Sequence, residues 1–134
     1  MKLIFALVIA LLLPVAAQAA DPAAPATEAA RSWLGLIDAG SYDRSWTQAS
    51  ALFRQRVSQD QWGGMVKSVR ESLGAVVSRE PAGAQLATTL PGAPDGKYAV
   101  VKFTTKFAKK ASATETVTMM MDGGTWKAAG YFIQ

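Results

Sequence analysis

The sequence predicts an α+β fold in which N-terminal helices pack on a curved antiparallel sheet of about four strands. Two observations support this prediction. Between residues 27 and 73 apolar side chains recur three and four positions apart, which is typical of amphipathic helices. From residue 75 onwards apolar and polar residues alternate between glycine-rich turns, which is typical of strands. Because such a sheet has one apolar face, we expect the helices to cover it and to leave a pocket between the two layers.

The first 19 residues have the pattern of a cleavable signal peptide. Lys2 gives a basic start, the apolar run from Leu3 to Leu13 follows, and Pro14 ends it before small residues at Ala17 and Ala19. The run is shorter than the roughly 20 apolar residues that span a bilayer. We therefore expect cleavage after Ala19, a periplasmic or secreted location, and no membrane span in the mature chain.

The chain after residue 19 is predicted to form a short spacer and one domain. Residues 20–26 contain two prolines among alanines, which predicts an extended spacer before a single domain over residues 27–134.

The chain contains no cysteine and no histidine. This excludes thiol nucleophiles, a Ser-His-Asp triad and the usual zinc sites, and we expect no metal and no cofactor. The net charge of +4 is only mildly basic, and we expect no nucleic-acid partner.

Three helices are predicted before residue 75. Thr27 can cap the first helix, which ends near Gly40. A less regular helix is expected from Tyr42 to Phe53. Ser58, followed three residues later by a glutamine, forms a capping box for a third helix that closes at Gly74. The expected buried positions are Ala30, Trp33, Leu34 and Ile37 in the first helix, Trp46, Ala49 and Phe53 in the second, and Trp62, Met65 or Val66, Val69 and Leu73 in the third.

Four strands are predicted in the second half. The first covers residues 75–79, is interrupted at Pro81–Gly83 and continues over residues 85–90. A turn-rich segment precedes the second strand, residues 97–108, whose core face contains Ala99, Val101, Phe103, Thr105 and Phe107. The third strand covers residues 114–121, and Asp122-Gly123-Gly124 forms a hairpin turn into the last strand, residues 125–133.

Short motifs along most of the chain point to a known family. The helical half contributes Trp33-Leu34, Asp38-x-Gly40, Tyr42-x-x-Ser45-Trp46, Phe53-Arg54, Val57-Ser58, Trp62, Arg70, Leu73-Gly74 and Ser78-Arg79. The sheet half contributes Leu90-Pro91-Gly92-x-Pro94-Asp95-Gly96-x-Tyr98, Phe103-x-Thr105-x-Phe107, Glu115-Thr116-Val117 and Trp126-Lys127-x-x-Gly130-Tyr131. From about Ala29 to Gln134 the chain resembles the bacterial domain-of-unknown-function 4019 family. The resemblance implies a cystatin-like, or nuclear-transport-factor-2-like, cone and an exported protein, and it implies no catalytic residues.

Aromatic, methionine and arginine side chains are the candidates for ligand binding. Four tryptophans are many for so small a domain, and the run Met119–Met121 places two methionines on one sheet face. Arg70 and Arg79 can clamp an anion or form ion pairs with Asp38, Asp43 or Glu71, and we expect ion pairs. The candidate ligand-binding residues are Trp33, Trp46, Arg70, Arg79, Phe103 and Met119.

Asp38 and Tyr42 are the candidates for catalysis in an alternative interpretation. Cone folds of this kind host cofactor-free isomerases that use an aspartate base together with a tyrosine that stabilises the oxyanion. If the carboxyl group of Asp38 were buried against Trp33 or Trp46, its pKa would rise and it could act as a base. The simpler interpretation is that Asp38 binds local backbone or an arginine, and that Glu115 pairs with a lysine across the sheet.

Five lysines make the second strand and the turn after it basic: Lys97, Lys102, Lys106, Lys109 and Lys110. With the interleaved Tyr98 they could bind nucleic acid. An exported protein favours the simpler interpretation of a solvated sheet face whose lysines prevent edge pairing.

The sequence thus predicts a non-catalytic module whose apolar pocket binds a small apolar or amphipathic ligand, or that binds an envelope protein. The alternatives are an isomerase or hydratase that uses Asp38 and Tyr42, and a structural protein that forms a homodimer through its sheet.

Overall fold

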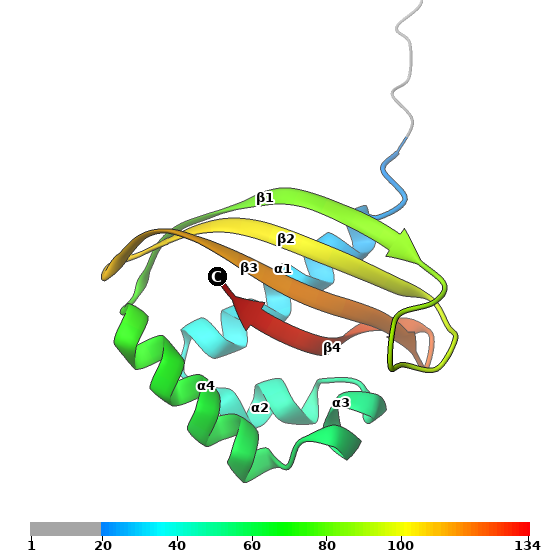
Figure 1. The fold of residues 1–134 in the computed structure, drawn as a ribbon, viewed down its shortest axis with the longest axis horizontal. Coiled ribbons are helices and arrows are strands. Elements are labelled where there is room, and N and C mark those ends of the chain that lie inside the picture. Colours follow the sequence, from blue (N-terminus) through cyan, green and yellow to red (C-terminus); the bar gives the residue numbers. More distant parts are fainter. Residues whose placement is uncertain (1–19) are drawn as a thin grey trace, which may run out of the picture.

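The computed structural model describes residues 20–134, and the signal-peptide and cleavage predictions lie outside these residues. Four helices precede one four-stranded antiparallel sheet with the strand order β1-β2-β3-β4. Figure 1 shows the curved sheet with the helices gathered on one side of it. The predicted α+β fold, with helices before a curved antiparallel sheet, is confirmed. In residues 20–134 no helix is long and apolar enough to cross a membrane.

Helix α1, Ala24–Asp38, begins after Ala23, so Thr27, the predicted cap, lies inside the helix. Proline is tolerated in a first turn, where its missing N–H has no helical partner, so Pro25 does not delay the helix. The carboxylate of Asp21 accepts a hydrogen bond of 2.9 Å from the backbone N–H of Ala23 just before the helix. Residues 24–26 therefore form the first helical turn and are not part of an extended spacer.

The single helix predicted over residues 42–53 is two short helices, α2 (Tyr42–Thr47) and α3 (Ala51–Arg56). Ser50 separates them because it adopts an extended backbone and caps α3, its hydroxyl accepting from the N–H of Phe53. The N–H of Ser50 itself donates to the carbonyl of Ala128 in the last strand, at 2.8 Å. The break is thus fixed by a contact with a distant part of the chain.

Helix α4, Gln59–Leu73, begins with the predicted capping box at Ser58 and ends at Gly74. Its buried side chains are Trp62, Val66 and Arg70, which repeat every four residues. Of the two alternatives Met65 and Val66, Val66 is the buried one, whereas Val69, which was expected to be buried, is exposed. The core-facing side of the helix therefore includes a charged residue that the apolar pattern did not suggest.

The sheet contains β1 (Val76–Ala87), β2 (Tyr98–Phe107), β3 (Lys110–Asp122) and β4 (Thr125–Ile133). The interruption predicted at residues 81–83 is a register shift within one continuous strand, between Pro81 and Gly83. The predicted core face of β2 is buried from Ala99 to Phe107 at every second residue. Gly123 and Gly124 both have positive φ between β3 and β4, as the predicted hairpin turn requires.

An aromatic cluster joins the two layers. The rings of Trp33 and Trp62 stack with centroids 5.7 Å apart, and Phe53 and Tyr131 contact both of them edge-on. The indole N–H groups of Trp33 and Trp62 donate to the backbone carbonyl and the hydroxyl of the fully buried Ser45, each at 2.8 Å. Because these polar groups are paired, the cluster forms a well-packed core with no cost from unpaired indole groups.

Candidate functional site

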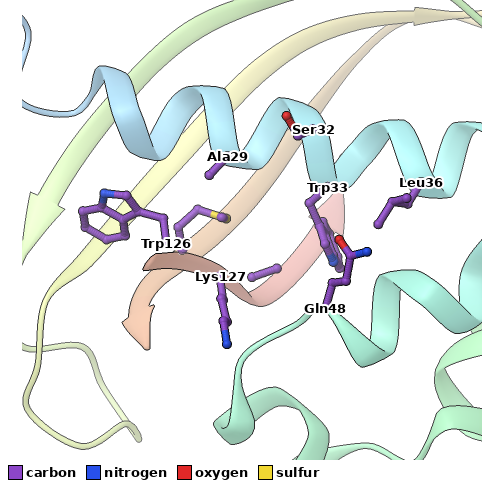
Figure 2. Close-up of a pocket in the computed structure, with 9 residues that line it drawn as sticks. Ala29, Ser32, Trp33, Leu36, Gln48, Trp126 and Lys127 are labelled. Carbon is purple, nitrogen blue, oxygen red and sulfur yellow. The ribbon is translucent and has the colours of Figure 1, made fainter. Parts of the chain in front are cut away.

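A pocket of about 370 Å³ lies between α1 and the strands β3 and β4. Helix α1 contributes Ala29, Ser32, Trp33 and Leu36, and the residue after α2 contributes Gln48. The sheet contributes Met119, Trp126, Lys127 and Ala128. Figure 2 shows the ring of Trp126 at one end of this pocket and that of Trp33 at the other, with α1 along one side. Six of these nine side chains are apolar, and none is acidic.

The pocket has a buried floor and partly exposed walls. Trp33 is 5% exposed and Met119 is 1% exposed, so they form the floor. Leu36 and Trp126 are half-buried and form apolar walls. The ammonium group of Lys97 lies 5.4 Å from the centroid of the Trp126 ring, which holds a positive charge beside one wall.

The structure places only two of the six predicted ligand-binding residues in this pocket, Trp33 and Met119. Trp46 packs at the margin of the core and donates its indole N–H to the carbonyl of Val57, at 2.8 Å. Phe103 is fully buried, with the guanidinium of Arg31 5.8 Å from its ring centroid.

Ala29 and Leu36 also line the pocket and were not predicted to do so. They precede Trp33 by four residues and follow it by three, and so share its side of the helix. This helical spacing is the sequence feature from which they could have been predicted. Trp126 is one of the four tryptophans that the sequence suggested for a pocket, and it lines this one.

Arg70 and Arg79 form ion pairs, as expected. Arg79 donates from Nε to Glu115 Oε1 at 2.7 Å and from Nη1 to Asp38 Oδ2 at 2.6 Å. Its Nη2 donates to both acids, at 3.0 Å to Asp38 and 3.2 Å to Glu115. Arg70 donates to Asp38 from the other side. Two arginines and two acids thus form a neutral network between α1, α4, β1 and β3.

Glu115 is fully buried and does not pair with a lysine as predicted. Besides Arg79, it accepts hydrogen bonds from the hydroxyl groups of Thr105 and Tyr131. The lysines of β2 lie on the opposite sheet face, whereas the side chains of Arg79 and Thr105 lie on the core face with Glu115. A buried carboxylate with this many donors is held in one place and has a structural role.

Arg70 is less completely paired than Arg79. Its Nε and Nη1 are buried and have no hydrogen-bond partner among residues 20–134. Its guanidinium carbon lies 5.2 Å from the centroid of the Phe107 ring, which provides a favourable contact with the cation. Asp38 is therefore the acid that compensates the buried charge of Arg70.

The electrostatics of the network oppose the role of Asp38 as a base. Burial alone would raise the pKa of Asp38, but hydrogen bonds from Arg79 and Arg70, together with their charges, outweigh it and hold this pKa below its ordinary value of 3.8. Catalysis by Asp38 as a base would require a raised pKa.

The pKa values of two other residues in the network are also shifted. Burial lowers the pKa of Arg79, but hydrogen bonds to Asp38 and Glu115 raise it overall. Burial and the neighbouring Glu115 carboxylate raise the pKa of Tyr131, so its hydroxyl remains a donor.

Asp38 and Tyr42 line a second pocket of about 570 Å³ together with Arg70 and Glu71. No hydrogen bond joins Asp38 and Tyr42 in the described part of the chain. The oxygens of Asp38 instead accept from the two arginines. Among residues 20–134 no group of three or more acidic, histidine or cysteine side chains is placed to hold a metal ion.

A third, apolar groove of about 270 Å³ separates α4 from β4. Its lining includes Trp62 and Tyr131 of the aromatic cluster and the exposed side chains of Met65, Val69 and Phe132. This groove is an alternative to the pocket between α1, β3 and β4 as the binding site of an apolar ligand.

Comparison with known proteins identifies the family of this chain. A family model described as "Protein of unknown function (DUF4019)" matches residues 29–131. No curated protein matches the chain.

Proposed function

The chain belongs to the DUF4019 family of proteins of unknown function, and from this premise we propose that it is a binding module whose ligand occupies the pocket between α1 and the strands β3 and β4. We propose a small amphipathic ligand with an apolar body. The observation that carries the proposal is the composition of this pocket, which has two tryptophans and no acidic side chain.

The size of the pocket favours a small ligand. Binding sites for small molecules measure about 300–1,000 Å³ and are lined mainly by apolar side chains with a few polar groups. The pocket measures about 370 Å³, near the lower end of this range. Leu36 and Trp126 would contact the apolar body, and Trp33 and Met119 would form the base on which it rests.

The polar residues of the pocket suggest where a head group would lie. Ser32 and Gln48 are exposed at its margin, and Lys127 is its one titratable lining residue. A ligand with a carboxylate or another anionic head group would match the positive charges of Lys127 and of the nearby Lys97.

The same lining favours binding over catalysis. General acid–base chemistry uses groups with a pKa near the working pH, most often histidine or a carboxyl group whose pKa is raised. The pocket contains neither, and the acids of the buried network are engaged by arginines. The exported location remains part of this proposal and rests on the pattern of residues 1–19.

Calorimetric titration of residues 20–134 with hexanoate, octanoate and decanoate tests the proposal. We expect saturable binding with one ligand per chain and an affinity that increases with chain length, because each further methylene buries more apolar surface. Ala29→Phe should abolish binding, since Ala29 lines the pocket and the larger side chain would fill it.

The matched control is Ala111→Phe, which makes the same change at an exposed alanine outside the pocket. This variant should bind like the wild type. The proposal is wrong if no chain length binds saturably, or if Ala29→Phe binds as well as Ala111→Phe while both remain folded by circular dichroism.

A further inference from the structure

The lysines of β2 require a different explanation from the one that the sequence suggested. Lys102 and Lys106 were expected to protect a sheet edge. The strand order places β2 between β1 and β3, with antiparallel partners on both sides, so it has no free edge. These side chains instead project from the exposed face of a central strand.

Three exposed lysines lie at one end of the sheet, and we call this surface the basic end. It consists of Lys106 near the end of β2, Lys109 at the hairpin turn and Lys110 at the start of β3, while Lys102 projects from the same face of β2 nearer its middle. Figure 1 shows this hairpin at the left end of the sheet, near the C-terminal end of α4. In the part of the chain that the structure describes, neither these three lysines nor Lys102 form an ion pair.

Few acids balance the basic end. No acidic residue occurs between Gly96 and Thr114. Two exposed acids lie near these lysines: Glu80, whose partner in the sheet is Thr104 of β2, and Glu71, two residues before the end of α4. Glu115 is buried on the opposite face and bound by Arg79. The lysines outnumber the exposed acids, so the surface keeps a positive charge.

An exposed aliphatic side chain adjoins the lysines. The pairing of β1 with β2 shifts register between Val76 and Ser78, whose partners are Phe107 and Lys106. Val77 lies within this irregularity and is 59% exposed. The basic end therefore combines several ammonium groups with one apolar side chain.

The hairpin that presents these charges is anchored to the helical layer. The N–H of Lys109 donates to the carbonyl of Leu73 at the end of α4, at 2.9 Å. The N–H of Ala108 donates to the carbonyl of Ala75, at 2.8 Å. The basic end is thus presented from a fixed position and would lose little conformational freedom on docking.

We propose that the basic end docks on the surface of a bilayer that contains anionic phospholipids. Charge complementarity identifies this partner, because clustered lysines that outnumber the acids beside them are attracted to an anionic leaflet within about a Debye length. Val77 would enter the interfacial region between the head groups. Nucleic acid fits less well because single strands stack on exposed aromatic rings, whereas Tyr98, Phe103 and Phe107 are all buried.

Vesicle co-sedimentation tests the proposal. Residues 20–134 are used, because they contain the whole described core and omit the apolar run from Leu3 to Leu13. Vesicles of phosphatidylcholine alone are compared with vesicles containing 30 mol% phosphatidylglycerol, roughly a third of the lipid, at low and high salt. We expect binding to the anionic vesicles only, and its loss at high salt.

Combined replacement of Lys106, Lys109 and Lys110 by glutamine should weaken binding by about 100-fold, since each lysine near an anionic surface contributes about fivefold. The matched control removes three exposed positive charges elsewhere, with Arg44, Arg56 and Lys67 on α2, α3 and α4 replaced by glutamine. It should bind nearly like the wild type.

Three results would overturn the proposal: no binding to the anionic vesicles at low salt, equal binding to both vesicle types, or equal losses in the two triple variants. Equal losses would mean that only the net charge matters. If single-stranded DNA bound in competition assays more tightly than the vesicles, the surface would belong to a nucleic-acid site instead.

Discussion

Asp38 is the residue on which the buried charge network most depends. It is the acid that compensates Arg70, and it also binds Arg79, whose second partner is Glu115. The side chains of both arginines are less than a tenth exposed, so loss of Asp38 would leave Arg70 buried without an acidic partner. A buried charge without a partner is costly, because the ion has lost its hydration.

We therefore predict that Asp38→Asn destabilises the fold by about 3 kcal/mol, the lower end for breaking a buried ion pair. Urea denaturation measures this change. Asp43→Asn is the control, because Asp43 is exposed on α2 and forms no ion pair among residues 20–134. Its effect should stay within about 0.5 kcal/mol. Similar stabilities of the two variants would contradict the role assigned to Asp38.

The lowered pKa of Asp38 predicts how this contribution depends on pH. A carboxyl group whose pKa is lower in the folded state stabilises the fold above its unfolded pKa, and this stabilisation is lost as the pH falls through the folded pKa. The ordinary pKa of Asp38 is 3.8, and its folded pKa lies below that value. The stability difference between the wild type and Asp38→Asn should therefore be constant near neutral pH and shrink below pH 3.8. Urea titrations across the acid range would contradict this if the difference did not change.

At the scale of the element, the end of α4 has the most demanding local geometry. Gly74 has φ of +79°, and a Cβ at this position would lie 3.1 Å from the Cβ of Ala108. The same turn sets the hairpin that carries the basic end, because Lys109 bonds to Leu73 there. Both the backbone conformation and the available space therefore require glycine.

Gly74→Ala should destabilise the chain by about 1–3 kcal/mol, as expected for an L-residue in a backbone region reserved for glycine. Gly64→Ala is the matched control within the same helix, because nothing lies within 4 Å of a Cβ added there. This control should stabilise the helix by up to about 1 kcal/mol. Thermal or urea unfolding measures both variants, and a neutral Gly74→Ala would refute the steric argument.

The sequence predicted those features of the elements that arise from neighbouring residues. The capping box at Ser58, the glycine turn at residues 122–124 and the alternation in β2 are local signals, and all three are confirmed. The break at Ser50 was missed because it depends on the carbonyl of Ala128, far along the chain.

At the scale of the whole molecule, the sequence predicted the two layers but only part of what lies between them. Ion pairs of Arg70 and Arg79 with one of three acids were expected, and the structure identifies Asp38 as a partner of both arginines. The pairing of Arg79 with Glu115 was missed, because the apolar pattern gives no register between β1 and β3. The sequence predicted a pocket between helices and sheet but not most of its lining residues, because these come from α1, β3 and β4, which are far apart in the chain.

The central claim is that an amphipathic ligand binds between α1 and the strands β3 and β4. The four tryptophans provide separate reporters, because Trp33 and Trp126 line that pocket, Trp62 lines the groove beside α4, and Trp46 lies in neither. The most direct measurement is a titration of ¹⁵N-labelled residues 20–134 with decanoate, followed through the indole N–H resonances by NMR. Binding in this pocket should give saturable shifts for the indole resonances of Trp33 and Trp126 and leave that of Trp46 unchanged. Shifts confined to Trp62, or none at all, would contradict it.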